Sequence, residues 1–140
     1  MRPYFEKMQD WGKPVKENKA NIDEIKKVEQ EVAAIVEEKK NAGMSAEILN
    51  KRGEWTVHQR LAYIVEPGTW CPLHTLYDPM DEESGTTGVV DGLGKINGRW
   101  CVIIGFDNKV MAGAWIAGQP HNILRVTDMA KRMHCPLVWL

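Results

Sequence analysis

The Asn97-Gly98 pair constrains the fold of this chain more than any other feature. It lies between two runs of apolar and small residues, 88–96 and 99–106. Asn-Gly accepts positive φ at both central positions of a type I′ turn, which makes it the strongest short-range signal of a β-hairpin. Toward its end the second run reads VII, so both faces of that strand are apolar. We therefore predict a hairpin within a layered sheet.

The segment after the hairpin predicts how the sheet continues. Residues 118–136 carry apolar side chains at helical spacing, and the apolar residues LVWL follow at 137–140. Strand, helix and strand in this order form a crossover unit, whose last strand lies parallel to an earlier one. The sequence therefore predicts an α/β fold.

A long amphipathic helix is expected near the N-terminus. Asn21 is a candidate N-cap, Glu24 stands close to the capping-box position, and Gly43 is a stop signal. Between these signals, apolar residues at steps of three and four form one narrow stripe: Ile22, Ile25, Val28, Val32, Ile35 and Val36. This helix either lies on its own domain or is an arm that contacts another subunit, and the sequence leaves both open.

A second, shorter helix is signalled by a Thr-x-x-Gln cap at Thr56 and by apolar residues at helical spacing up to Val65. Pro67-Gly68 then predicts a turn. The polar stretch YDPMDEESGTT at 77–87 is expected to form a mobile loop.

Composition excludes several classes of protein. The formal net charge is −1, and no stretch interleaves aromatic residues with Lys or Arg, so no nucleic acid partner is expected. No apolar segment approaches the roughly 20 residues of a membrane-spanning helix. The N-terminal residues also lack the apolar core of a signal peptide. These features indicate a single cytoplasmic domain.

The cysteines, Cys71, Cys101 and Cys135, are expected to be reduced and partly buried. They are odd in number, widely spaced, and set among apolar residues or beside a proline. A structural zinc site usually takes its four ligands in two compact pairs. The loose pair Cys71–His74 and the adjacent His134–Cys135 do not match that pattern, so no metal site is predicted.

The segment MAGAWIAG at 111–118 is the strongest candidate for chemistry. It consists of small residues around one large ring and follows the second hairpin strand. Small residues let a backbone approach another segment or a ligand closely, and backbone amides exposed there can donate to a carbonyl oxygen or an oxyanion. Tight packing between strand and helix is the alternative explanation.

No other catalytic set is evident. Neither a Gly-x-Ser-x-Gly elbow nor a phosphate-binding Gly-Lys-Ser/Thr loop is present. The histidines are scattered, so we expect each of them at the surface or at a helix cap: His58, His74, His121 and His134. Gly92-x-Gly94 precedes a hairpin rather than a helix, which excludes a dinucleotide-binding turn.

The order of these motifs resembles that of biotin-dependent carboxyltransferase subunits. NKRGEWTVHQRLAYIVEPGTW is similar to the Lys-Arg-Gly to Asp-Pro-Gly-Ser segment near the start of those subunits. GVVDGLGKINGRWCVIIGFDNKVMAGAWIAGQ is similar to the segment that leads through an apolar strand into their small-residue acyl-CoA loop. MRPYFEKM, GKPVKEN and CPLHTLYDP are most similar to the glutaconyl-CoA decarboxylase type.

The resemblance implies a crotonase-like fold, built from repeated strand-strand-helix turns, and a homodimer of the full-length subunit. It implies transfer of a carboxyl group from an acyl-CoA, here glutaconyl-CoA, to biotin on a separate carrier subunit. A membrane decarboxylase subunit would then release carbon dioxide and export sodium, and this subunit would be peripheral to the membrane through the complex. Positions carried over are Ala112, Gly113 and Ala114 beside bound CoA, and Lys51 and Arg52 near its phosphates.

Subunits of this family are several times longer than 140 residues, so we expect an N-terminal part of one. Residues 1–66 would be an arm with helices, and 67–140 the start of the N-terminal carboxyltransferase domain. The main amide-donor loop would lie beyond Leu140, which leaves the catalytic residues unknown and the piece alone inactive. Two alternatives stay open. One is a methylmalonyl-CoA or propionyl-CoA carboxyltransferase, and the other is a non-catalytic module that docks through its first helix.

Overall fold

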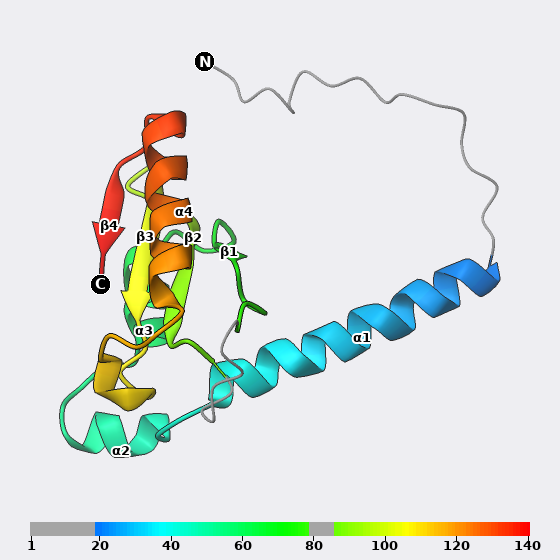
Figure 1. Ribbon diagram of the computed structural model, residues 1–140, viewed down its shortest axis with the longest axis horizontal. Coiled ribbons are helices and arrows are strands. Elements are labelled where there is room, and N and C mark those ends of the chain that lie inside the picture. Colours follow the sequence, from blue (N-terminus) through cyan, green and yellow to red (C-terminus); the bar gives the residue numbers. More distant parts are fainter. Residues whose placement is uncertain (1–18, 79–85) are drawn as a thin grey trace. The chain divides into compact units, whose positions relative to one another are not determined.

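The computed structural model describes residues 19–78 and 86–140 (Figure 1). Its elements are α1 (Lys19–Asn41), α2 (Ala46–Lys51), α3 (Val57–Ile64), β1 (Cys71–Leu73), β2 (Val89–Ile96), β3 (Arg99–Phe106), the 3₁₀ turn η2 (Met111–Gly113), α4 (Gln119–Met133) and β4 (Leu137–Trp139). Packing divides the chain after Ala33. The last turns of α1 therefore belong with the sheet, and the rest of α1 is a separate unit.

The four strands form one sheet in the order β1-β2-β3-β4. β2 and β3 are antiparallel and joined by the expected turn, in which Asn97 has φ 49° and Gly98 has φ 76°. β4 lies parallel to β3, with Val102 opposite Leu137. The predicted hairpin and the predicted crossover through α4 are both confirmed.

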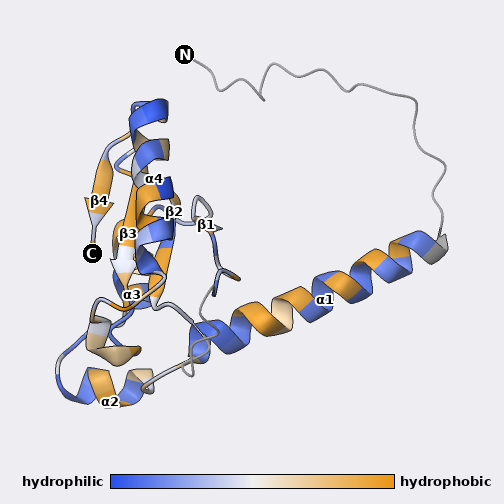
Figure 2. Ribbon diagram, in the orientation of Figure 1, coloured by the Kyte–Doolittle hydropathy of each residue, from blue (hydrophilic) through white to orange (hydrophobic). Residues whose placement is uncertain are grey.

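β3 is the central strand because its side chains are buried on both faces of the sheet. Cys101 and Ile103 pack against α3, while Val102 and Ile104 pack against α4. The two helices thus cover opposite faces, and the apolar colour concentrates on the strands between them (Figure 2). This arrangement explains why the end of β3 has no polar face.

The close approach of α3 to the sheet depends on a glycine in β3. A Cβ atom at Gly105 would lie 2.3 Å from Cγ2 of Val57, the first residue of α3. The predicted cap of α3 is confirmed, since Thr56 Oγ1 accepts from the Gln59 N–H at 3.2 Å and Gln59 Oε1 accepts from the Thr56 N–H at 2.9 Å. The domain boundary expected after residue 66 stays a prediction.

Two local expectations are wrong. Asn21 does not cap the first helix, because α1 begins two residues earlier, at Lys19. The helix propensities of Lys and Ala at 19–20 outweigh the preference of Asn for the N-cap position. Cys71 is exposed rather than partly buried. It lies in β1, a three-residue strand at the edge of the sheet, where the missing N–H of Pro72 is tolerated.

The apolar stripe of α1 is largely exposed in this chain. Ile25 and Val28 keep 58% and 56% of their surface accessible. Every helix within residues 19–78 and 86–140 is too short or too polar to cross a bilayer. The loop expected at 77–87 falls mostly outside the described residues.

Candidate functional site

The small-residue loop follows β3 and begins with a buried polar anchor. The Asp107 N–H donates to Gly88 O at 2.8 Å, which ties the loop to the start of β2. Asp107 Oδ1 accepts from the Lys109 N–H at 3.1 Å, and its Oδ2 lies 3.7 Å from Lys109 Nζ. Both side chains are buried, so the charge of each is balanced by the other.

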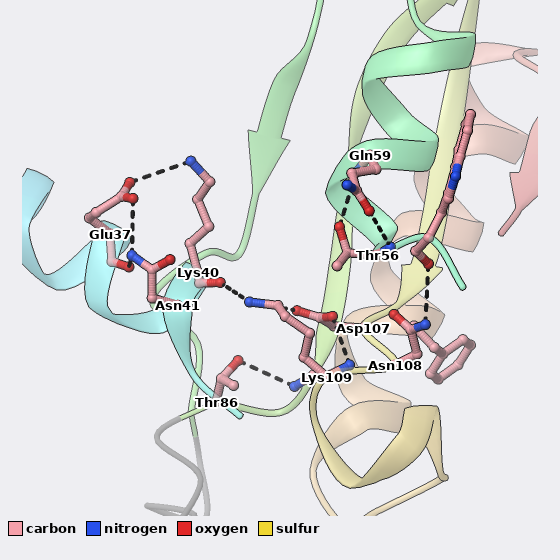
Figure 3. A network of polar contacts seen from close by, with 12 residues as sticks. Glu37, Lys40, Asn41, Thr56, Gln59, Thr86, Asp107, Asn108 and Lys109 are labelled. Carbon is pink, nitrogen blue, oxygen red and sulfur yellow. Dashed lines mark hydrogen bonds and ion pairs between the residues drawn. The ribbon is translucent and has the colours of Figure 1, made fainter. Parts of the chain in front are cut away.

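The end of α1 and the turn that follows it form hydrogen bonds with this loop. The Met44 N–H donates to Lys109 O at 2.9 Å, and Lys109 Nζ donates to the Lys40 carbonyl, as Figure 3 shows. A Cβ atom at Gly43 would lie 2.3 Å from the Lys109 oxygen, so no larger residue fits there. On another side, Asn108 Nδ2 donates to Trp55 O at 3.2 Å. The loop is therefore held by backbone contacts from several segments.

The middle of the loop is a left-handed turn. Met111, Ala112 and Gly113 have φ values of 47°, 54° and 75°. For an L-residue this region costs roughly 1–2 kcal/mol. The Gly113 N–H donates to Val110 O at 2.8 Å, and the Ala114 N–H donates to Met111 O at 3.0 Å. The N–H groups of Gly113 and Ala114, which the sequence predicted as possible donors to a ligand, therefore form hydrogen bonds within the turn.

The end of the loop is fixed by Gln119, the first residue of α4, whose side chain is only 2% exposed. Its Oε1 accepts from the Ile116 N–H at 3.1 Å. Its Nε2 donates to Thr87 O at 2.7 Å and to Ala114 O at 3.2 Å. Sequence reasoning missed this residue, because a glutamine at the start of a helix is ordinarily exposed.

Aromatic rings lie beside the loop. The ring centroids of Phe106 and Trp115 are 5.8 Å apart, and those of Phe106 and Trp139 are 6.0 Å apart. Trp115 and Trp139 are 59% and 49% exposed. The site therefore combines a rigid backbone turn with a partly open apolar surface, which suits an acyl group next to a hydrogen-bonded carbonyl.

Among the described residues, no polar interaction joins Lys51 or Arg52 to Ala112–Ala114. Lys51 ends α2 and Arg52 is its C-cap, and both side chains are exposed. The segment that follows them reaches the loop, since Trp55 O accepts from Asn108. Their role toward CoA stays a prediction.

A second polar group, also missed by sequence reasoning, joins β1 to β2. His74 Nδ1 lies 2.9 Å from Oδ1 of Asp91, whose side chain is fully buried, and Asp91 Oδ2 has no partner among the described residues. Burial raises the pKa of Asp91, and the contact with His74 partly opposes that rise. His74 is therefore neither a cap nor a simple surface residue, whereas His134 does cap α4, in the left-handed conformation.

His58 lines a cavity of about 250 Å³, together with Trp70, Leu73 and Val89. Burial lowers the pKa of His58, so its imidazole is held neutral. The surface position expected for it is only partly right, since the ring is half-buried.

Residues 49–140 match the family described as "Carboxyl transferase domain". This match covers the chain from α2 to β4 and includes the loop. The chain belongs to the carboxyl transferase domain family, as its motifs indicated.

Among curated relatives, the glutaconyl-CoA decarboxylase subunit alpha of Acidaminococcus fermentans is 45% identical over 141 aligned residues. The alignment covers 100% of this chain and 24% of that protein, so the chain spans about a quarter of its relative's length. The propionyl-CoA carboxylase beta chain of Cereibacter sphaeroides is 27% identical over 101 residues, which cover 67% of this chain and 20% of that protein.

Solved structures support the fold. Transcarboxylase 12S, with methylmalonyl-CoA and methylmalonic acid bound, has a TM-score of 0.70 at 19% identity and covers 79% of this chain and 23% of that one. The beta subunit of Pseudomonas aeruginosa geranyl-CoA carboxylase has a TM-score of 0.63 at 21% identity and covers 95% of this chain and 26% of that one. The predicted crotonase-like α/β fold, preceded by N-terminal helices, is confirmed.

Proposed function

We propose that this chain supplies the first part of an acyl-CoA-binding carboxyltransferase domain, in a subunit that transfers a carboxyl group from glutaconyl-CoA to biotin. The observation that carries the proposal is the 45% identity to the glutaconyl-CoA decarboxylase subunit alpha along the whole chain. The rigid loop from Asp107 to Gln119, with its small residues and its aromatic neighbours, is consistent with that role.

In this proposal the acyl-CoA lies along Ala112–Ala114. The exposed side chains of Lys51 and Arg52 face the CoA phosphates. Loss of the carboxyl group leaves an enolate-like thioester oxygen, which is stabilised by backbone amides on a rigid loop. Further donors would come from the part of the subunit that follows residue 140. Residues 67–140 would then form the start of the N-terminal carboxyltransferase domain.

Biotin enters as a second substrate, carried by a separate subunit. Trp115 and Trp139 leave the aromatic side of the loop open, so a carrier can reach it. Biotin would bring the ureido nitrogen that accepts the carboxyl group. Homodimerisation, a membrane decarboxylase partner, and a cytoplasmic location peripheral to the membrane complete the proposal.

The test is a carboxyltransfer assay with the complete subunit, using glutaconyl-CoA and free biotin, and with methylmalonyl-CoA as the competing substrate. We expect higher kcat/KM on glutaconyl-CoA. Preference for methylmalonyl-CoA would favour the other branch of the family. The 140-residue chain alone should bind CoA without turnover, and a folded chain with no CoA affinity would favour a docking module.

A further inference from the structure

The pair formed by His74 and Asp91 combines two unfavourable features in one place. His74 has φ 51°, a left-handed conformation that costs a residue other than glycine roughly 1–2 kcal/mol. Asp91 is only 1% exposed, and a buried carboxylate with a single hydrogen-bond partner is also unfavourable. Backbone strain of this kind concentrates at functional sites. A role beyond joining β1 to β2 is therefore expected for this pair.

The left-handed conformation is what brings the His74 ring to Asp91. Leu73, the last residue of β1, lies opposite Asp91 in the sheet and packs in the cluster under α4. In a regular strand the next side chain would face the other way. The positive φ of His74 breaks this alternation, and its Nδ1 lies 2.9 Å from Asp91 Oδ1.

Asp91 decides which nitrogen of the His74 ring is free. A carboxylate oxygen only accepts, so Nδ1 carries the proton that it donates to Asp91, and Nε2 carries the lone pair. Among the described residues Nε2 forms no hydrogen bond. The His74 side chain is 24% exposed, whereas that of Asp91 is fully buried. A buried carboxylate that orients an accessible imidazole is the arrangement of a general base, because it stabilises the imidazolium that forms on proton uptake.

The pair lies on the same side of the sheet as the candidate loop. Val89 and Leu93 alternate with Asp91 along β2, so the three side chains share one face. Val89 and Leu93 pack in the cluster that includes α4, the helix to which the loop leads. Val89 also lies opposite Phe106, the last residue of β3 before the loop. The pair and the start of the loop are therefore at one end of the sheet, on one face.

The cavity that His58 lines joins these two regions. Part of its wall comes from the residues on either side of His74, and another part comes from the start of the loop. These residues are Leu73 and Thr75, together with Gly88 and Asp107. An acyl chain bound there contacts both the loop and the segment that carries the imidazole.

Carboxyl transfer from an acyl-CoA to biotin requires a proton to move in the opposite direction. The C–C bond to the carboxyl group breaks, and its electron pair stays on the acyl carbon as an enolate. The ureido nitrogen of biotin forms the new N–C bond and loses its proton. That proton is the one the acyl carbon needs, so the two steps balance without another reactant, and a positioned base can carry it between them.

We propose that His74 carries this proton and that Asp91 is its positioning residue. Nε2 accepts the proton from the ureido nitrogen as the N–C bond forms, and then donates it to the acyl carbon. Glutaconyl-CoA thereby becomes crotonyl-CoA, in which hydrogen has replaced the carboxyl group. The inference rests on the proposed function for its substrates, and it adds an acid–base residue to the backbone donors of that proposal.

The role of His74 is tested on the complete subunit by hydrogen exchange of crotonyl-CoA in deuterated water, without biotin. A protein group that carries the proton also removes one from this carbon of the product and returns a deuteron. We expect the wild type to deuterate the carbon, measured by mass spectrometry. His74→Asn should slow the exchange by about 10²-fold to 10⁴-fold, the usual contribution of a general acid–base group.

Asparagine separates the chemical role of His74 from its structural role. It tolerates the left-handed conformation, and its side-chain N–H can donate to Asp91 in place of Nδ1, but it carries no proton to a substrate. Urea denaturation of His74→Asn should therefore stay close to that of the wild type. His134→Asn is the matched control, because His134 has φ 53° and no carboxylate partner among the described residues. It should exchange at the wild-type rate.

Asp91→Asn tests the positioning role. It keeps an oxygen that accepts from Nδ1 and removes the charge that stabilises the imidazolium. The kcat of the exchange should fall at least about tenfold, with the KM for crotonyl-CoA unchanged. A raised KM with unchanged kcat would show that Asp91 shapes the binding site and does not act through His74.

Two results would overturn the role of His74. One is no deuteration by a wild type that transfers carboxyl groups, and the other is deuteration by His74→Asn at the wild-type rate. Failure of the wild type to transfer a carboxyl group from glutaconyl-CoA to biotin would contradict the proposed function instead. In that case, exchange that depends on His74 would still support the acid–base assignment, and its absence would overturn both.

Discussion

Gly43 lies directly against the carbonyl of Lys109, so that a Cβ atom at position 43 would come within 2.3 Å of that oxygen. Gly43 also has φ +80°, and the next residue, Met44, donates to the same oxygen at 2.9 Å. Gly43, which the sequence predicted as the stop signal of α1, thus also supports the candidate loop. Residues 43 and 109 are 66 positions apart in the sequence, and their backbones can approach this closely because Gly43 has no side chain.

We predict that Gly43→Ala destabilises the chain by about 3 kcal/mol or more, because it adds a backbone clash to the strain of positive φ. Gly53→Ala is the matched control, since Gly53 has φ +78° but nothing within 4 Å of its Cβ position. Its cost should be only about 1 kcal/mol. Urea denaturation measures both. Equal losses would show that the contact with Lys109 is not close.

The half-buried imidazole of His58 predicts a loss of stability in acid. Burial lowers its pKa from 6.5, so below that pH the unfolded chain binds a proton that the folded chain refuses. The free energy of unfolding should therefore fall as the pH drops from about 6.5. His58→Gln should flatten this slope between pH 7.5 and 5.5, whereas His121→Gln, at an exposed position of α4, should not. A slope unchanged by His58→Gln would contradict the assignment.

The carboxyl group of Asp91 predicts that the free energy of unfolding changes with pH in the direction opposite to that caused by His58. Burial raises its pKa above 3.8, so the folded chain holds this proton more tightly than the unfolded chain, and stability falls as the pH rises through the shifted pKa. His74→Ala removes the group that partly opposes this shift and leaves a buried carboxylate unpaired. At pH 7 we expect a loss of about 3 kcal/mol.

Asp91→Asn provides the comparison, because it keeps the shape and removes the charge. Its loss at pH 7 should be smaller than that of His74→Ala, measured by guanidinium denaturation of both variants. In the Asp91→Asn protein, removal of His74 should cost little. If the two substitutions were additive, the bond between His74 and Asp91 would carry no stability.

The role of Lys51 and Arg52 is tested by salt-dependent CoA binding. The double variant Lys51→Ala/Arg52→Ala should bind CoA about threefold to tenfold more weakly at low ionic strength, with the difference shrinking in high salt. Binding of acetyl-pantetheine, which lacks the nucleotide phosphates, should not change. Lys131→Ala, on the exposed last turn of α4, is the control for total charge. Equal losses with both ligands would assign the pair a structural role.

Much of the sheet could be predicted because its signals are local. Asn97-Gly98 specifies its turn through the φ values it tolerates, and the apolar end of β3 requires cover on both faces. The short strand β1 was not predicted, because three residues that include a proline carry no local signal of a strand. Only their pairing with β2 makes them one.

The candidate site was predicted less completely than the fold. Small residues at 111–118 marked the right segment, but the amides of Gly113 and Ala114 close their own turn. Gln119 binds the Ala114 carbonyl and the Ile116 N–H, and nothing in the sequence around Gln119 indicates that its side chain is buried. The bond between His74 and Asp91 likewise joins residues that only strand pairing brings together.

Local patterns were enough to predict the hairpin, the crossover through α4, the cap at Thr56 and the family, because turn preferences, helical spacing and motif order are properties of short segments. Three further features depend on how the whole chain packs: Gly43 supports Lys109, Gln119 is buried, and Asp91 contacts His74. These are contacts between distant segments. Their free energy depends on burial and on hydrogen-bond geometry, which exist only once the chain has packed.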